Sequence, residues 1–217
     1  MTNRQLAIDD DLYAYVVAHG ATPDPVMRDL IEETHTHLTD QAEMQIGPDQ
    51  AAFLTFLTKL LDAKAAVEVG TFTGMSALAI ARGLADGGQL TCFDISEEYT
   101  SVARRYWERA GVADRIDLRI GPAAERITEL PAEPHIDIAF VDADKTGYPT
   151  YWAELVPRMR PGGVIAIDNV LRGGRVVAPS TESDKVVVAF NEQVRDDDRV
   201  DAIMLPLADG LTLARRR

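Results

Sequence analysis

The chain has 217 residues, 46% of them hydrophobic, and its 35 acidic and 22 basic side chains give a net charge of -13. A chain of this length is most simply one domain, and the acidic balance argues against nucleic acid, because binding to a phosphate backbone depends on clustered Lys and Arg. We expect a cytoplasmic protein without membrane contact, because no apolar run approaches the roughly 20 residues of a membrane span and no apolar signal segment stands at the N-terminus.

The first 63 residues carry helical spacing. A first helix is predicted by apolar and aromatic side chains at three- and four-residue steps, namely Leu12, Tyr15, Val16 and His19. Asp24-Pro25 is typical of a helix cap followed by proline at the first helical position, which predicts a second helix. Gly47-Pro48 breaks the chain and starts a third helix, whose expected buried face is Ala52, Phe53, Phe56, Leu57, Leu60 and Leu61.

From residue 64 onward strands and helices alternate. We expect strands over 65–69, 89–94, 116–120, 136–142 and 163–168, and helices over 75–85, 97–110, 123–130 and 148–159. This alternation predicts a doubly wound α/β fold, with a parallel sheet and helices on both faces. Cys92, the only cysteine, lies inside the second strand and is expected to be a small buried side chain.

The last part of the chain departs from this alternation. A longer helix over 184–196 is followed by strands over 200–207 and 211–214, separated only by Ala208-Asp209-Gly210. A turn this short permits only a hairpin, so the last strand should run antiparallel to the others.

A glycine stretch, Glu68-Val-Gly70-Thr-Phe-Thr-Gly74, follows the first strand. A strand that passes through a glycine turn into a helix opens a nucleotide-binding sheet. The dinucleotide fingerprint started at Gly70 would need glycine where Phe72 and Met75 stand. The spacing Glu-x-Gly-x-x-x-Gly is instead the pattern of S-adenosylmethionine (SAM) methyltransferases. A plain turn in another doubly wound domain remains the alternative, because short glycine motifs are weak signals.

Polar residues follow the next two strands, at the edge where parallel sheets bind ligands. Asp94 ends the second strand 24 residues after Gly70, where an acidic residue accepts hydrogen bonds from ribose hydroxyls. Its alternative role is a cap for the following helix, which Ser96 can also fill. Gly121-Pro122-Ala123 resembles a turn that lays backbone beside a flat ring such as adenine.

Asp142, Asp168 and Asn169 end the fourth and fifth strands. If these strands are neighbours, about 4.8 Å apart, their side chains can converge. Two carboxylates and an amide oxygen suit Mg²⁺, Ca²⁺ or Mn²⁺ better than zinc, and adjacent buried carboxylates repel unless a cation or proton intervenes. The alternative is acidic loop caps. Lys145, three residues beyond Asp142, is a candidate general base or an ordinary surface lysine.

Six stretches together carry a family resemblance, at residues 44–54, 67–76, 121–123, 140–145, 168–171 and 205–213. On them the chain resembles the cation-dependent class I O-methyltransferases of the caffeoyl-CoA and catechol O-methyltransferase type, in their small bacterial form. The resemblance implies a Rossmann-like seven-stranded sheet, mostly parallel with an antiparallel last strand, plus N-terminal helices. It also implies one domain over 1–217, with 1–63 as a helical extension and 64–217 as the SAM-binding core, and a homodimer.

The resemblance also implies roles for single residues. SAM contacts are implied for Ile46, Glu68, Gly70, Thr71 and Ser76. Asp94 would bind the ribose and Ala123 the adenine. Residues near the methionine end of the cofactor would be Asp142, Asp144 and Tyr151. A divalent cation, with Mg²⁺ preferred over Ca²⁺ or Mn²⁺, would be held by Asp142, Asp168 and Asn169. Lys145 looks like the base that takes the phenol proton, with Asp142 as the second catalytic residue.

The implied activity is methyl transfer to a hydroxyl of a vicinal aromatic diol, a small phenolic substrate. Two alternatives are a metal-independent small-molecule SAM methyltransferase and a non-catalytic SAM-binding dimeric module. The sequence departs from the family at Gly147, where Asn is usual, and at Arg172, where Trp is usual. Because both stretches should border the acceptor pocket, we hypothesise that Arg172 favours a smaller, polar or anionic acceptor.

Overall fold

The computed structural model describes residues 6–217. Its N-terminal part is helical, with α1 Asp10–Gly20, α2 Pro25–His37, the 3-10 turn η1 Ala42–Met44 and α3 Pro48–Leu60. The predicted cap of α2 is present, since Asp24 accepts a hydrogen bond from the Met27 N–H at 2.9 Å and Pro25 occupies the first helical position. No helix within residues 6–217 is long and apolar enough to cross a membrane.

The buried face of α3 differs from the prediction. Phe56 and Leu60, which we expected in the core, are 65% and 70% exposed. Of the predicted face, Leu57 is buried, and Phe53 and Leu61 pack against the core partly buried. The buried residues of α3 are Gln50, Ala51, Leu54, Leu57 and Thr58. The reason is the close packing of α3 on α4: Thr55 donates to the Ala79 carbonyl at 2.8 Å, which turns the Phe56 side outward.

Seven strands form the sheet: β1 Ala65–Val69, β2 Gln89–Asp94, β3 Ile116–Ile120, β4 Ile136–Val141, β5 Met159–Ile167, β6 Val200–Leu205 and β7 Leu211–Arg216. Their order is β3-β2-β1-β4-β5-β7-β6. The first five strands are parallel, and β7 runs antiparallel to both β5 and β6, as the short turn predicted. The predicted fold class is therefore confirmed. β5 begins four residues earlier than expected, at a register shift opposite Ile136.

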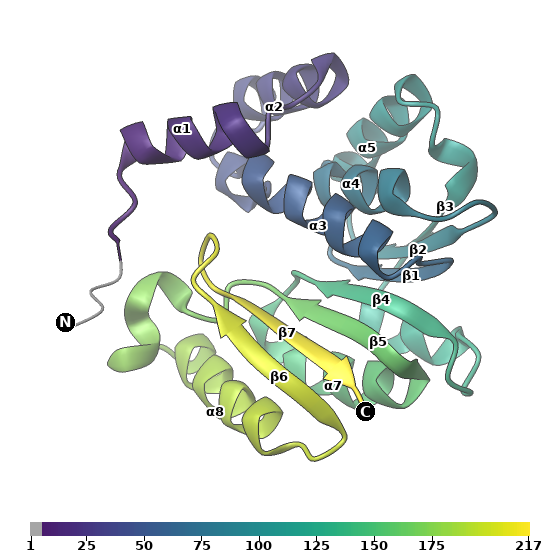
Figure 1. Ribbon diagram of the computed structural model, residues 1–217, viewed down its shortest axis with the longest axis vertical. Helices are drawn as coiled ribbons and strands as arrows, with labels where there is room; N and C mark the ends of the chain where they lie inside the picture. Colours follow the sequence, from purple (N-terminus) through teal and green to yellow (C-terminus); the bar gives the residue numbers. More distant parts are fainter. Residues whose placement is uncertain (1–5) are drawn as a thin grey trace.

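Helices cover both faces of this sheet (Figure 1). α3 lies with α4 Met75–Gly83 and α5 Glu97–Arg109 on one face, and α7 Tyr148–Arg158 lies with α8 Glu182–Asp196 on the other. The predicted helix over 123–130 divides into α6 Ala123–Arg126 and a 3-10 turn. The central strand β1 serves both cores, because Ala66 packs with the α4 side and Val67 and Val69 pack with the α7 side.

The strand order reverses at β1, which lies between β2 and β4. The chain passes from β1 outward to β2 and β3, then returns to β4 on the other side. At such a switch point the loops after the two central strands separate, which opens a crevice at their carboxyl ends. The fold thus places the loops after β1 and β4 around one crevice, at whose base they meet.

Candidate active site

A cavity of about 800 Å³ lies at this switch point, which is a usual size for a small-molecule site. Its walls come from the loops after β1 to β5, the segment 43–50 that leads into the first turn of α3, and the tip of the β6–β7 hairpin. Twelve of the thirteen predicted site residues line it, namely Ile46, Gly70, Thr71, Ser76, Asp94, Ala123, Asp142, Asp144, Lys145, Tyr151, Asp168 and Asn169.

Glu68 is the exception. Its side chain is 0% exposed and lies behind the loop, on a strand position paired with Cys92 of β2. Oε2 accepts a hydrogen bond from the Thr71 hydroxyl at 2.9 Å, and Oε1 has no partner. Burial raises the pKa of Glu68 to about 7. The carboxylate therefore supports the cavity wall through Thr71 and does not itself face the cavity.

We expect Glu68→Gln to flatten the pH dependence of folding stability. Because folding raises the pKa of Glu68 from 4.5 to about 7, the folded protein keeps a proton that the unfolded chain has lost between these values. The contribution of Glu68 is thus fully present below pH 4.5 and is lost as pH rises through 7, by on the order of 3 kcal/mol. Urea unfolding at pH 4.5 and pH 8 should show that the free energy of unfolding falls less with pH in the variant than in the parent. An equal decrease in both proteins would contradict the raised pKa of Glu68.

The loop after β1 is held by Asp94. One carboxylate oxygen accepts from the Thr71 and Phe72 N–H groups, and the other from the Ser96 N–H, all at 2.8 Å. Ser96 itself caps α5 by accepting from the Tyr99 N–H. The helix cap is thus filled without Asp94, whose carboxylate organises the glycine loop at one end of the cavity.

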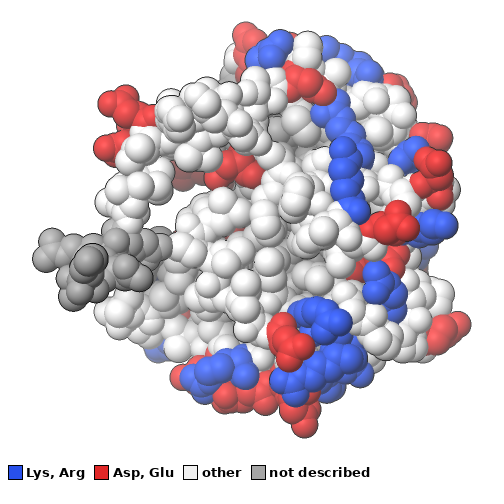
Figure 2. All heavy atoms as spheres, in the orientation of Figure 1, with Lys and Arg blue, Asp and Glu red and all other residues white. Residues whose placement is uncertain are grey.

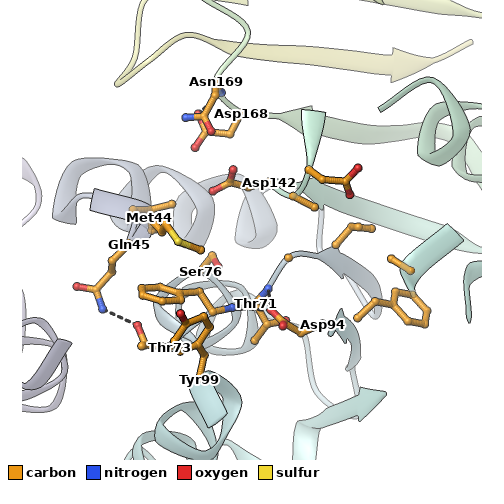
Figure 3. Close-up of a pocket in the computed structure, with 18 of the residues that line it drawn as sticks. Met44, Gln45, Thr71, Thr73, Ser76, Asp94, Tyr99, Asp142, Asp168 and Asn169 are labelled. Atoms are coloured by element: carbon orange, nitrogen blue, oxygen red, sulfur yellow. Dashed lines mark hydrogen bonds between the residues drawn. The ribbon is translucent and has the colours of Figure 1, made fainter. Parts of the chain in front are cut away.

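Asp142, Asp168 and Asn169 meet at the other end. Figure 3 shows Asp142 between the Asp168–Asn169 pair and the loop that carries Thr71. β4 and β5 are neighbours, as the prediction required, and the Asp168 N–H donates to the Val141 carbonyl at 3.0 Å. Asn169 adopts a left-handed backbone with φ of +54°, which asparagine tolerates better than most residues. The strand ends therefore bring two carboxylates and an amide to one corner.

The chemistry of this corner fits a divalent cation. Burial, and then the charge of Asp142, raise the pKa of Asp168, so the charged form of Asp168 is disfavoured unless positive charge is supplied. Within residues 6–217 no three His, Cys, Asp or Glu side chains gather as a metal cluster. The candidate donors are two carboxylates and one amide, an all-oxygen set that suits a hard cation.

Lys145 lies beside this corner. Its Nζ donates to Asp142 Oδ1 at 3.0 Å and to the Tyr148 hydroxyl at 2.8 Å. Tyr148 is buried, and its hydroxyl donates in turn to the Asp168 carbonyl at 2.9 Å. Among the cavity-lining residues in the described part of the chain, Lys145 is the only Lys, Arg or His. It is therefore the only basic side chain there that could accept a proton.

The two departures from the family pattern have structural explanations. A Cβ atom at Gly147 would lie 2.5 Å from the Tyr151 ring, so a larger residue would displace Tyr151. Arg172 does not line the cavity. Its Nε lies 3.4 Å from Asp184 Oδ1, and Arg175 contacts the same oxygen at 3.1 Å. Because this buried carboxylate at the start of α8 attracts Arg172, the hypothesis that Arg172 selects the acceptor is not supported.

Several cavity residues were not predicted from the sequence, namely Gln45, Gln50, Phe72, Tyr99, Ala208 and Asp209. Gln50 carried no usable signal, because the periodicity of α3 does not say which of its faces meets the core. Asp209 stands in the predicted hairpin turn, where it accepts a hydrogen bond from the Gly173 N–H. A turn residue that fixes another loop cannot be recognised without the fold.

Known proteins resemble this chain over nearly its whole length. The model of the O-methyltransferase family matches residues 17–217. Caffeoyl-CoA O-methyltransferase 2 of Zea mays is 38% identical, over 99% of this chain and 86% of that protein. Caffeoyl-CoA O-methyltransferase of Eucalyptus gunnii is 36% identical, over 99% and 90%. The O-methyltransferase of Bacillus cereus, solved in complex with S-adenosylhomocysteine, superposes with a TM-score of 0.84 at 29% identity, over 94% of this chain and 96% of that one.

Proposed function

The chain belongs to the O-methyltransferase family, and we propose that this SAM-dependent enzyme requires a divalent cation and methylates a hydroxyl of a catechol-type aromatic molecule. The observation that carries the proposal is the corner formed by Asp142, Asp168 and Asn169, beside Lys145 and in the same cavity as the glycine loop. Mg²⁺ is the preferred cation, with Ca²⁺ and Mn²⁺ as alternatives.

The donor half of the cavity is assigned to the loop after β1 and its neighbours. SAM supplies a methyl group activated by a positively charged sulfur. Three of the roughly four acceptor positions of the Asp94 carboxylate are used by backbone N–H groups, so about one remains for a ribose hydroxyl. Ala123 would contact the adenine, and Ile46 and Ser76 would contact the cofactor from the walls of the cavity. Tyr151, which donates a hydrogen bond to Asp144, would face the methionine end of the cofactor.

The acceptor half is assigned to the corner after β4 and β5. Asp142, Asp168 and Asn169 would hold the cation, whose positive charge lowers the pKa of a hydroxyl placed beside it. Lys145 Nζ takes the phenol proton, and Asp142 holds Nζ in place through the 3.0 Å hydrogen bond. Most of the remaining rate enhancement would come from residues of this cavity that orient the acceptor toward the methyl donor.

Methyl transfer from labelled SAM to paired substrates tests the proposal. A catechol should be methylated and the matching phenol with a single hydroxyl should not. EDTA should abolish the transfer, and excess Mg²⁺ should restore it. Full activity under EDTA would favour the metal-independent alternative. The non-catalytic module is disfavoured because Asp142, Lys145, Asp168 and Asn169 are all present in the cavity, and absence of transfer to any acceptor would favour it.

We also propose a homodimer. α1 buries none of its residues, and its Tyr15 is 62% exposed. Phe56 and Leu60 of α3 are exposed as well. α1, α3 and β6 run along the face seen in Figure 1, whose centre carries few charged side chains in Figure 2. Apolar surface of this kind marks an interface. Sedimentation should give twice the chain mass of 23.8 kDa; a monomer would contradict the proposal.

A further inference from the structure

Gln50 carries a polar amide side chain that is buried in the core-facing side of α3. It lies in the first turn of α3, on the face shared with Ala51 and Leu54, and is 1% exposed. A buried amide costs free energy unless it is hydrogen-bonded. Its Nε2 donates to Asp168 Oδ2 at 2.8 Å, across 118 residues of sequence. This contact joins the N-terminal helices directly to the candidate cation ligand after β5.

The contact completes the fixing of the Asp168 carboxylate. Oδ1 accepts from the Asn169 N–H at 2.6 Å, while Oδ2 accepts from Gln50. A carboxylate offers about four lone-pair positions, so two remain for a cation once these bonds are made. The backbone bond alone would leave the carboxylate free to rotate about its Cβ–Cγ bond. The bond from Gln50 removes that freedom.

Each carboxylate of the corner thus accepts a hydrogen bond from its own side-chain nitrogen donor. Asp142 is held by Lys145, and Asp168 by Gln50. We propose that Gln50 is a positioning residue for the cation, which fixes the Asp168 carboxylate so that its free lone pairs face the cavity. This inference rests on the proposed cation site. Outer partners of metal ligands commonly govern affinity in this way, by about 10- to 100-fold.

The position of Gln50 gives the N-terminal segment a part in the site. Five residues earlier, Gln45 Nε2 donates to the Thr34 and Thr73 hydroxyls, both at 2.9 Å. The segment between these two glutamines contributes Ile46 and Gly47 to the cavity wall. It is therefore fastened to the glycine loop at one end and to Asp168 at the other. A rigid segment of this kind can keep the amide of Gln50 in register with the carboxylate.

The role of Gln50 can be tested by measuring Mn²⁺ binding to the full chain with electron paramagnetic resonance, in the absence of SAM. Gln50→Met keeps the length of the side chain but removes the donor, and we expect it to weaken the Kd for Mn²⁺ by about tenfold or more. Gln50→Asn keeps the amide but is too short to reach Asp168, so it should weaken the Kd for Mn²⁺ by a similar factor. It also provides a second test of the role of Gln50 if the methionine variant does not fold. Thr58→Val is the matched control, because it removes a buried hydrogen bond on the same face of α3 away from the cavity.

The outcomes separate the two proposals. A purely structural role predicts that both Gln50 variants lose stability, as Thr58→Val should, while their Mn²⁺ affinity stays within twofold of the parent; that result would overturn the inference. If the parent itself binds no Mn²⁺ at millimolar concentration, the cation site fails, and the positioning role fails with it. A weakened Kd for both Gln50 variants and an unchanged one for Thr58→Val would support the inference.

Discussion

Replacing Lys145 with methionine should lower kcat by about two to four orders of magnitude, the usual contribution of a general base. Lys145 is the only basic side chain among the described residues that line the cavity. Its Nζ is fixed by Asp142 at 3.0 Å and by Tyr148 at 2.8 Å. Methionine preserves much of the side chain's length and removes the amine, so the proton of the acceptor hydroxyl would have to leave to bulk water or hydroxide.

Three measurements distinguish loss of the base from general damage. The affinity for S-adenosylhomocysteine should be unchanged, because the donor half of the cavity does not depend on Lys145. Cation affinity should not fall, because the variant removes a hydrogen-bond donor that competes with the cation for Asp142. The residual activity should rise with pH more steeply than that of the parent as hydroxide replaces the amine. A kcat within threefold of the parent would mean that bulk base already suffices.

Tyr148→Phe is the matched comparison for Lys145. The phenol accepts a hydrogen bond from Nζ and donates one to the Asp168 carbonyl. Its removal leaves the amine in place but held by Asp142 alone. We expect kcat to fall about tenfold, the effect of losing the hydrogen bond between Nζ and the phenol, at about 1.4 kcal/mol. A loss as large as that of Lys145→Met would instead make Tyr148 part of the proton path.

The strands and the polar residues at their ends could be predicted because both follow from local pattern. β1, β2 and β3 begin and end where the apolar runs do. In a parallel sheet all carboxyl ends meet at one edge, so Asp94, Asp142 and Asp168 could be assigned to one site without any knowledge of side-chain direction. The short turn before β7 fixed the antiparallel strand by the same kind of argument.

The incorrect predictions share another cause: they depend on which of two possible faces of a helix or strand packs against the core. α3 carries one stripe through Ala51, Leu54 and Leu57 and a second through Phe56 and Leu60, and periodicity does not say which one meets α4. Glu68 belongs to a motif with a cofactor, yet it points into the core. Gln50 and Asp168 are joined across 118 residues, a distance at which local pattern carries no information.

Gly70→Ala should disable both halves of the site at once. Gly70 has φ of +87°, and a Cβ there would lie 1.9 Å from the backbone oxygen of Asp142 and 2.7 Å from its carbonyl carbon. The left-handed backbone and the overlap together should cost about 3 kcal/mol. The loop after β1 and the end of β4 would have to separate. Because a shift of about 1 Å can cost 100-fold in rate, we expect at least that loss in kcat/KM.

Gly87→Ala supplies the control for backbone strain. Gly87 has φ of +74°, but a Cβ there would meet nothing within 4 Å. Gly87→Ala should therefore lower the free energy of unfolding by only about 1 kcal/mol and leave the affinity for S-adenosylhomocysteine unchanged. Calorimetric binding and urea unfolding of both variants separate strain from overlap. If Gly70→Ala bound S-adenosylhomocysteine as tightly as Gly87→Ala does, the close approach of the glycine loop to Asp142 would matter for packing and not for cofactor binding. The donor and cation halves would then be independent, and alanine at position 70 would be tolerated by the chemistry.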